Sequence, residues 1–322
     1  MNSVIERDHP KTASIDVVPS GGYLGAEIGN VDLRAPTAAQ VAQISDALVR
    51  HEVIVFRDQD LSFDELIEFG RRFGKLSVNP FTFNRPDRPE GMLLDSSPEK
   101  PPALSDRWHS DESFRPEPPL GTILRGRVVP PNGGDTVFSS MTTAYKGLSD
   151  RMQRYLHGLE ALHDFKAFRN FFDQSPQAVK RLRDFEDQFP ASSHPVVRVH
   201  PVSGKRAIFV NPQFTLRIKD VSDEENTAIL NLLYGLTSIP EYQFRVKWKP
   251  NTVVFWDNRS TQHYAPYDYY PHHRLMERVT VSGDQPINVT GEWERQVDAQ
   301  ESPWLKMRAH NAKKIQAPKN LY

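Results

Sequence analysis

The chain has 322 residues, enough to bury a sizeable core as one catalytic domain. Lys and Arg number 40 against 41 Asp and Glu, so the net charge of -1 gives no broad electrostatic reason to expect nucleic acid or a membrane surface as a partner. Cysteine is absent, which excludes disulfides and thiolate metal sites and favours a cytoplasmic location. No signal segment or run long enough to cross a bilayer is evident, so we expect a small-molecule partner.

The N-terminal part of the chain predicts a helix, a strand and a second helix. Residues 1–14 are polar, and we expect them to be frayed. Capping-box patterns at Thr37–Gln40 and Ser62–Glu65 predict two helix starts, and Gly74 is a candidate end for the second helix. The apolar run 53–56 between them predicts a buried strand.

The next segment predicts a long loop followed by strands. Residues 76–105 are rich in Pro, Asn, Asp and Ser, which predicts an irregular stretch. Residues 121–129 and 136–139 have strand character and flank a turn-forming segment at 130–135. This pattern predicts a hairpin, with Thr136 just past its tip.

Residues 166–192 hold five phenylalanines among many charges. This pattern predicts a lid or insertion whose inner face is aromatic. A pair of helices packed on a core is an equally good interpretation. A second hairpin is expected across 195–200 and 206–210. Another capping box, at Ser222–Glu225, predicts a helix.

The C-terminal part returns to strands. Apolar and polar residues alternate over 242–248, and residues 253–256 form an apolar run, so both segments predict strands. Beyond about residue 295 the chain is basic without periodicity, which favours a surface arm or an oligomer contact. Strands therefore outnumber helices in the predicted catalytic part.

Three side chains suggest a metal centre. Asp111 follows His109 by two positions, and on an extended strand such residues share one face. His263 follows the predicted buried strand much later in the chain. Two imidazoles and one carboxylate suit non-haem Fe(II), because they leave positions open for a chelating co-substrate and dioxygen. Arg274 offers the bidentate cation that a dicarboxylate co-substrate requires, so the pattern favours an oxygenase.

Four motifs together resemble the TauD/TfdA family of Fe(II)- and 2-oxoglutarate-dependent dioxygenases, over about residues 16–290. The motifs are WHSD (108–111), GGDT (133–136), WDNRSTQHYAPYDY (256–269) and RLMERVTVSGD (274–284). The resemblance implies a mainly β chain with flanking helices, folded as a double-stranded β-helix, the jelly roll of cupins. It also implies one dioxygenase domain over 15–294, a C-terminal extension over 295–322, and a homodimer or homotetramer.

The resemblance also implies roles for individual residues. The Fe(II) ligands would be His109, Asp111 and His263. Thr136 and Arg274 would hold the distal carboxylate of 2-oxoglutarate, and Arg278 would face the acidic group of the substrate or the C1 end of 2-oxoglutarate. The implied reaction uses O2 to hydroxylate a substrate C–H bond and yields succinate and CO2.

The chain departs from the taurine-type members at the substrate side. Those members have His, Tyr and Asn where this sequence has Asn79, Thr82 and Ser105, which argues against taurine itself. Phe81 and Phe114 are candidates for an apolar pocket wall, or are ordinary core residues. We therefore expect a small or medium organic anion: a sulfonate, a sulfate ester, or an aryloxy or carboxylic acid.

Other functions fit parts of the same pattern. The enzyme could take an uncharged or amino-acid-like substrate if Arg278 serves 2-oxoglutarate, and Arg278 could instead form a surface ion pair with Glu277. A non-catalytic ligand-binding β-barrel would need none of the cofactors. A zinc hydrolase would explain the metal ligands but leave Thr136 and Arg274 without a role.

Overall fold

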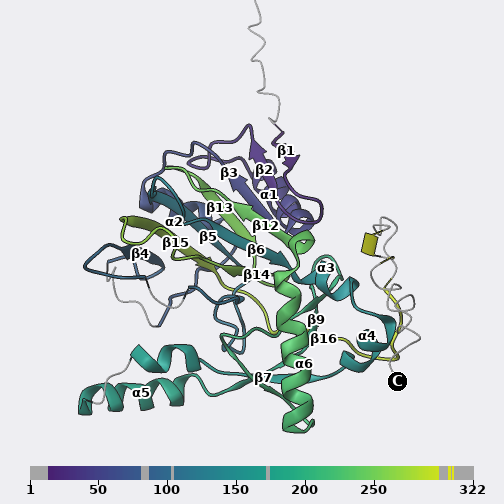
Figure 1. Cartoon of the computed structure of the whole chain (residues 1–322). Coiled ribbons are helices and arrows are strands. Elements are labelled where there is room, and N and C mark those ends of the chain that lie inside the picture. Colours follow the sequence, from purple (N-terminus) through teal and green to yellow (C-terminus); the bar gives the residue numbers. More distant parts are fainter. Residues whose placement is uncertain are drawn as a thin grey trace, which may run out of the picture.

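The computed structural model describes residues 14–80, 87–102, 105–171 and 175–296, together with Trp304, Leu305 and Met307. Within these ranges the chain is mainly β, and its helices lie on the outside of the sheets (Figure 1). The expected fold class is therefore confirmed. Most of the predicted frayed N-terminus and most of the C-terminal extension lie outside the described residues.

The largest sheet has seven strands and is almost entirely antiparallel. Its one parallel pair is β2 with β3. In spatial order the strands are β1 (Asp16–Pro19), β2 (Ala26–Gly29), β3 (Val53–Phe56), β13 (Val253–Asp257), β5 (Gly121–Val128), β15 (Arg274–Val281) and β4 (Gly91–Ser96).

Three smaller sheets of three strands complete the β structure. The first is β12 (Gln243–Val246), β6 (Thr136–Ser140) and β14 (Thr261–Tyr264). The second is β11 (Thr215–Ile218), β7 (Glu160–His163) and β8 (Ser192–Pro195). The third is β10 (Arg206–Ile208), β9 (Val197–Val199) and β16 (Ile287–Asn288), and its β9–β10 pair confirms the second predicted hairpin.

The central strands of the large sheet are apolar on both faces because both faces are covered. In β3, Ile54 and Phe56 pack under the helices, whereas Val53 and Val55 pack into the barrel interior. The neighbouring β13 alternates in the same way, and its Trp256 points into the interior. Side chains two apart share a face, so each strand contributes to two cores at once.

Three of the helices begin where the sequence predicts. All three expected capping boxes are present, at Thr37, Ser62 and Ser222. The second helix ends at Arg71, before Gly74. The α-helices are α1 (Ala38–His51), α2 (Phe63–Arg71), α3 (Met141–Lys146), α4 (Asp150–Leu156), α5 (Pro176–Gln188) and α6 (Asp223–Gly235), and the 3-10 helices are η1 (Lys166–Phe171), η2 (Leu236–Ser238) and η3 (Pro240–Tyr242). No helix among the described residues is long and apolar enough to cross a membrane.

Two predictions about the middle of the chain were wrong. The stretch 76–105 is not irregular throughout, because it contains β4, which pairs with β15 at the edge of the large sheet. The predicted hairpin of β5 with β6 does not form, since β5 pairs with β13 and β15 while β6 pairs with β12 and β14. The turn segment carries the chain from one sheet to the other, which brings Thr136 into the barrel rather than to a hairpin tip.

The phenylalanine-rich segment has the predicted aromatic underside. Phe168, Phe185 and Phe189 pack against a cluster that also holds Phe114 and Phe214. Helix α5 projects away from the sheets (Figure 1). The segment thus forms the rear of one wall of the barrel, and its motion as a lid stays a prediction, as do the predicted domain boundaries.

Candidate functional site

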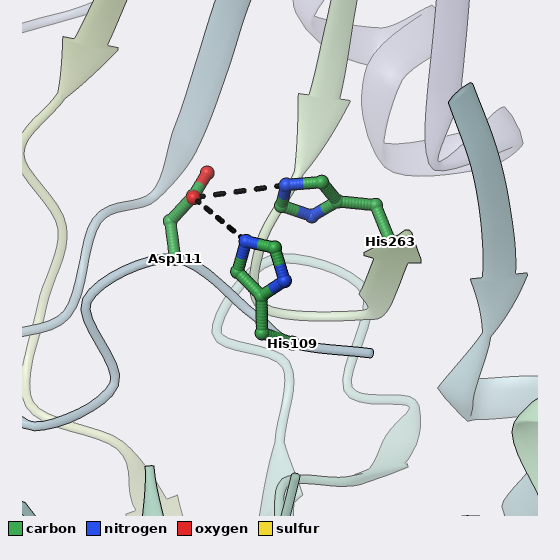
Figure 2. Close-up of side chains that lie close together, drawn as sticks. All are labelled: His109, Asp111 and His263. Atoms are coloured by element: carbon green, nitrogen blue, oxygen red, sulfur yellow. Dashed lines mark ion pairs between the residues drawn. The ribbon is translucent and has the colours of Figure 1, made fainter. Parts of the chain in front are cut away.

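His109, Asp111 and His263 converge in the fold although they are far apart in the chain. Their side chains point toward one another (Figure 2). The Oδ1 atom of Asp111 lies 3.8 Å from Nε2 of His109 and 3.7 Å from Nε2 of His263. All three are buried, and among the described residues they form the group able to hold a metal ion. The structure thus brings the three predicted ligands together.

The backbone itself holds the two histidines side by side. The N–H of His263 donates to the carbonyl of His109 at 2.8 Å, and the reciprocal bond is 3.1 Å. This isolated antiparallel bridge places the ring centroids 4.1 Å apart. Nδ1 of His109 lies 2.8 Å from the carbonyl oxygen of Arg107, which favours a proton on Nδ1 and leaves Nε2 free to bind a metal.

The protonation states suit a cation. Burial holds the pKa of both His109 and His263 below the ordinary value, so both imidazoles are neutral at physiological pH. Burial alone would raise the pKa of the Asp111 carboxyl, but Arg278 and the two imidazoles hold it below its ordinary value. Neutral imidazoles and an ionised carboxylate are the forms that bind metals.

The three residues line a cavity of about 380 Å³. Such a volume suits a small-molecule site. Its walls also include Thr136, Arg274 and Arg278, together with Asn79 and Ser105. The described residues predicted for metal, co-substrate and substrate therefore share one cavity, with Phe114 as the exception.

Arg274 is an unusual cation within this cavity. It is 7% exposed, burial lowers its pKa, and its Nε has no hydrogen-bond partner among the described residues. Its guanidinium carbon lies 5.5 Å from the ring centroid of Tyr269. Tyr269 and the carboxylate of Asp135 attract this guanidinium, but its pairing is incomplete, so the cavity offers a cation to an anionic ligand.

Thr136 is oriented by a tryptophan. The Nε1–H of Trp248 donates to Thr136 Oγ1 at 3.0 Å. An indole N–H can only donate, so the Thr136 hydroxyl accepts this bond and keeps its own proton to donate elsewhere. Trp248 lies outside the four motifs, so this contact could not be predicted from them.

Arg278 faces the metal ligands rather than solvent. Its Nη2 lies 2.8 Å from Oδ1 of Asp111, and its Nε donates to Thr280. The alternative partner Glu277 points to the other face of β15 and pairs with the buried Arg125 at 3.2 Å. The surface ion pair considered for Arg278 is therefore wrong, because adjacent strand residues face opposite ways.

The predicted substrate-side residues are placed differently from one another. The Asn79 amide donates to Glu112 at 3.0 Å, and the backbone N–H of Ser105 donates to the Tyr267 hydroxyl at 2.7 Å. Phe81 and Thr82 lie outside the described residues. Phe114 packs in the aromatic cluster behind the cavity wall, which agrees with the alternative that it is a core residue.

Sequence reasoning missed several wall residues. Gln213 is 3% exposed and lines the cavity, and its Oε1 has no hydrogen-bond partner within the described ranges. Phe168 and Phe214 form an aromatic wall, and the Phe214 ring lies 6.3 Å from that of His109. Lys100 stands on the rim. These residues are scattered between motifs, so only the fold reveals that they meet.

A two-histidine, one-carboxylate centre at one end of a β-barrel, beside a buried arginine, defines the class of non-haem iron enzymes that use a dicarboxylate co-substrate. The sequence profile of the family described as "Taurine catabolism dioxygenase TauD, TfdA family" matches residues 16–280, and this chain belongs to that family. It is an Fe(II)- and 2-oxoglutarate-dependent dioxygenase; 2-oxoglutarate is also called alpha-ketoglutarate.

Known proteins of the family support this conclusion. The alpha-ketoglutarate-dependent sulfate ester dioxygenase of Pseudomonas putida is 36% identical over 294 residues, which cover 89% of this chain and 95% of the relative. The alkylsulfatase of Acinetobacter baylyi is 34% identical, covering 84% and 86%. The crystal structure of a taurine dioxygenase from Burkholderia xenovorans matches with a TM-score of 0.72 and 34% identity, covering 85% and 93%. This structural match confirms the double-stranded β-helix.

Proposed function

We propose that this enzyme oxidises organosulfur anions, with alkyl sulfate esters as its preferred substrates. Two of the relatives named above act, by their names, on sulfate esters. The cavity joins an aromatic wall of Phe168 and Phe214 to the cation of Arg278, which suits an apolar chain that ends in an anionic group.

In this proposal the cavity has a metal side and a co-substrate side. His109, Asp111 and His263 hold Fe(II). Thr136 and Arg274 hold the distal carboxylate of 2-oxoglutarate through a hydroxyl proton and a guanidinium fork. Arg278 faces the sulfate group, with Asn79 and Ser105 nearby on the substrate side.

When bound, iron with 2-oxoglutarate and O2 supplies the oxidising power, which converts a C–H bond to C–OH while 2-oxoglutarate becomes succinate and CO2. If the oxidised carbon bears the ester oxygen, the product carries a hydroxyl and a sulfate on one carbon. That carbon–oxygen bond to sulfate then breaks, the hydroxyl loses its proton, and an aldehyde and inorganic sulfate are released. The balance is one ester, one 2-oxoglutarate and one O2 to one aldehyde, sulfate, succinate and CO2.

The protein contributes positioning and exclusion of water. Arg278 fixes the charged end, so the carbon next to it is the one held near the metal ligands. The aromatic wall keeps the remaining chain out of water and shields the site during reaction.

The observation that carries the co-substrate side of the proposal is the buried Arg274, whose Nε has no hydrogen-bond partner in the described part of the chain, in the same cavity as His109, Asp111 and His263. A zinc hydrolase has no need of a buried cation that binds a dicarboxylate, whereas an enzyme that uses 2-oxoglutarate needs such a cation.

The test measures succinate and sulfate together. Fe(II)-loaded enzyme with 2-oxoglutarate and O2 is given octyl sulfate, octanesulfonate, taurine or octanol. We expect equal succinate and sulfate from octyl sulfate, and much lower succinate from taurine and octanol. Asp111→Ala should abolish both products, whereas Asp46→Ala, an exposed carboxylate on α1, should retain them. Succinate formation with octanol but not octyl sulfate would contradict the proposal and favour an uncharged substrate.

Assembly as a homodimer or homotetramer and a cytoplasmic location stay predictions. Sedimentation and cell fractionation test them directly.

A further inference from the structure

We infer that Thr122 and Asn258 are positioning residues that fix the orientation of the Asp111 carboxylate. The inference rests on the proposed metal site. Thr122 lies on β5 and is fully buried, and Asn258, which follows β13, is 2% exposed. Both contact Asp111, and neither belongs to the predicted ligand or co-substrate residues.

The orientation of the Asn258 amide is fixed by its neighbours. Its Oδ1 lies 2.9 Å from Nε1 of Trp256 and 3.3 Å from the backbone nitrogen of Asp111. An indole N–H and a backbone N–H can only donate, so the amide atom between them must be the oxygen. The amide nitrogen therefore faces Thr122.

That assignment determines where the Thr122 proton goes. Nδ2 of Asn258 lies 3.1 Å from Thr122 Oγ1 and can only donate to it. The Thr122 hydroxyl has a single proton, and its other close partner is Oδ2 of Asp111 at 2.7 Å. The proton is therefore donated to Oδ2.

The two carboxylate oxygens thus have different tasks. Oδ2 accepts the short bond from Thr122, whereas Oδ1 lies 2.8 Å from Nη2 of Arg278 and is the oxygen nearest to Nε2 of both histidines. A hydrogen bond to a charged acceptor in a buried site is strong and directional. The network therefore holds Oδ2 in place, so that Oδ1 is the oxygen that would bind a metal.

The network is anchored in rigid structure. Thr122 is the register partner of Trp256 across the β5–β13 pair, so the donor to Oδ2 and the donor to Asn258 come from adjacent strands. Their buried positions leave little freedom to the hydroxyl or the amide. Partners that orient a metal ligand typically change metal affinity by about 10- to 100-fold when they are lost.

The test is metal affinity, measured without turnover. Free Mn(II) is followed by electron paramagnetic resonance while it is titrated into the full chain. Thr122→Val keeps the shape but removes the hydroxyl, and we expect its dissociation constant to rise about 10- to 100-fold. Thr122→Ser restores the donor and should bind within about threefold of the wild type, as should Thr237→Val, which removes another buried hydroxyl that bonds Tyr234.

Asn258→Asp is the second variant. It keeps the size of the side chain but places a carboxylate oxygen opposite Thr122. The Thr122 hydroxyl would then donate its proton to this oxygen instead of to Asp111, and Mn(II) binding should weaken. It decides the question if Thr122→Val does not fold. Equal affinity of wild type, Thr122→Val and Asn258→Asp would overturn the inference while the metal site stands. If the wild type itself does not bind Mn(II), the proposed function fails as well.

Discussion

Replacing Arg274 with leucine should separate co-substrate affinity from protein stability. In the structure the guanidinium is buried, and its Nε has no hydrogen-bond partner among the described residues. A dicarboxylate bound there would gain two charge-assisted hydrogen bonds, each worth about 1.5–3 kcal/mol. Their loss would cost about 3–6 kcal/mol, which corresponds to an affinity for 2-oxoglutarate weaker by about 10² to 10⁴-fold.

The free energy of unfolding should not fall with it. Without co-substrate, Arg274 is a buried cation with incomplete pairing, so the shorter, uncharged leucine removes a desolvation cost. We therefore expect Arg274→Leu to have a melting temperature equal to or above that of the wild type. Arg274→Lys keeps the charge but lacks the planar fork, and should lose at least about tenfold in affinity.

Isothermal titration calorimetry of 2-oxoglutarate into Mn(II)-loaded protein measures the affinity, and differential scanning calorimetry measures the stability. Arg217→Leu, an exposed arginine on β11, serves as the matched control and should leave the affinity unchanged. The reasoning is refuted if Arg274→Leu binds 2-oxoglutarate within about threefold of the wild type, because the buried charge would then have another purpose.

Three further predictions follow from single contacts. Gln213→Leu removes the amide from the cavity wall and should raise the KM for octyl sulfate about 3- to 10-fold, while the KM for 2-oxoglutarate stays unchanged. A rise in both KM values would contradict a contact between Gln213 and the substrate alone. Trp248→Phe removes the indole N–H that donates to Thr136 Oγ1, and it should weaken 2-oxoglutarate binding by about tenfold in calorimetry. Unchanged binding would show that the Thr136 hydroxyl does not need this donor to be oriented. Burial raises the pKa of the Glu52 carboxyl to about 7, so the folded state holds a proton that the unfolded state releases, and stability is lost as pH rises from about 4.5 to 7. Glu52→Gln keeps the hydrogen bond from Thr142, so its free energy of unfolding should exceed that of the wild type by on the order of 2–3 kcal/mol at pH 8 but not at pH 4. Urea unfolding measures this difference, and an equal gain at both pH values would refute the raised pKa.

Local signals in the sequence predicted the local structure well. The capping boxes at Thr37, Ser62 and Ser222 form within one helical turn, so their bonds depend on neighbouring residues alone. The continuous apolar run 53–56 was equally informative, because it is typical of a short strand covered on both faces.

Pairing across the chain was not predictable from the same signals. The Pro-Pro-Asn-Gly-Gly turn between β5 and β6 has the composition of a hairpin, yet the partners of β5 come from β13 and β15. Strand β4 has only the short apolar run Met92 to Leu94, surrounded by prolines, and it exists because β15 offers an edge. Tertiary pairing decided both cases.

The candidate site divides along the same line. His109, Asp111 and His263 lie in dense motifs, and the structure brings them together as expected. Gln213, Trp248 and Thr122 lie in ordinary sequence, and their contacts appear only when distant strands meet. Motifs thus identify reacting groups, whereas the residues that orient those groups depend on the fold.

The backbone bridge between His109 and His263 has a mechanical consequence. The chain has no cysteine and so forms no disulfide. A metal ion bound by these two histidines would act as a reversible cross-link between the segments around residues 109 and 263, which already pair through their backbones. Occupancy by the metal would then restrain the opening of the barrel mouth as a disulfide restrains a loop. Removal of the metal would thereby lower the stability of the fold as well as end the reaction.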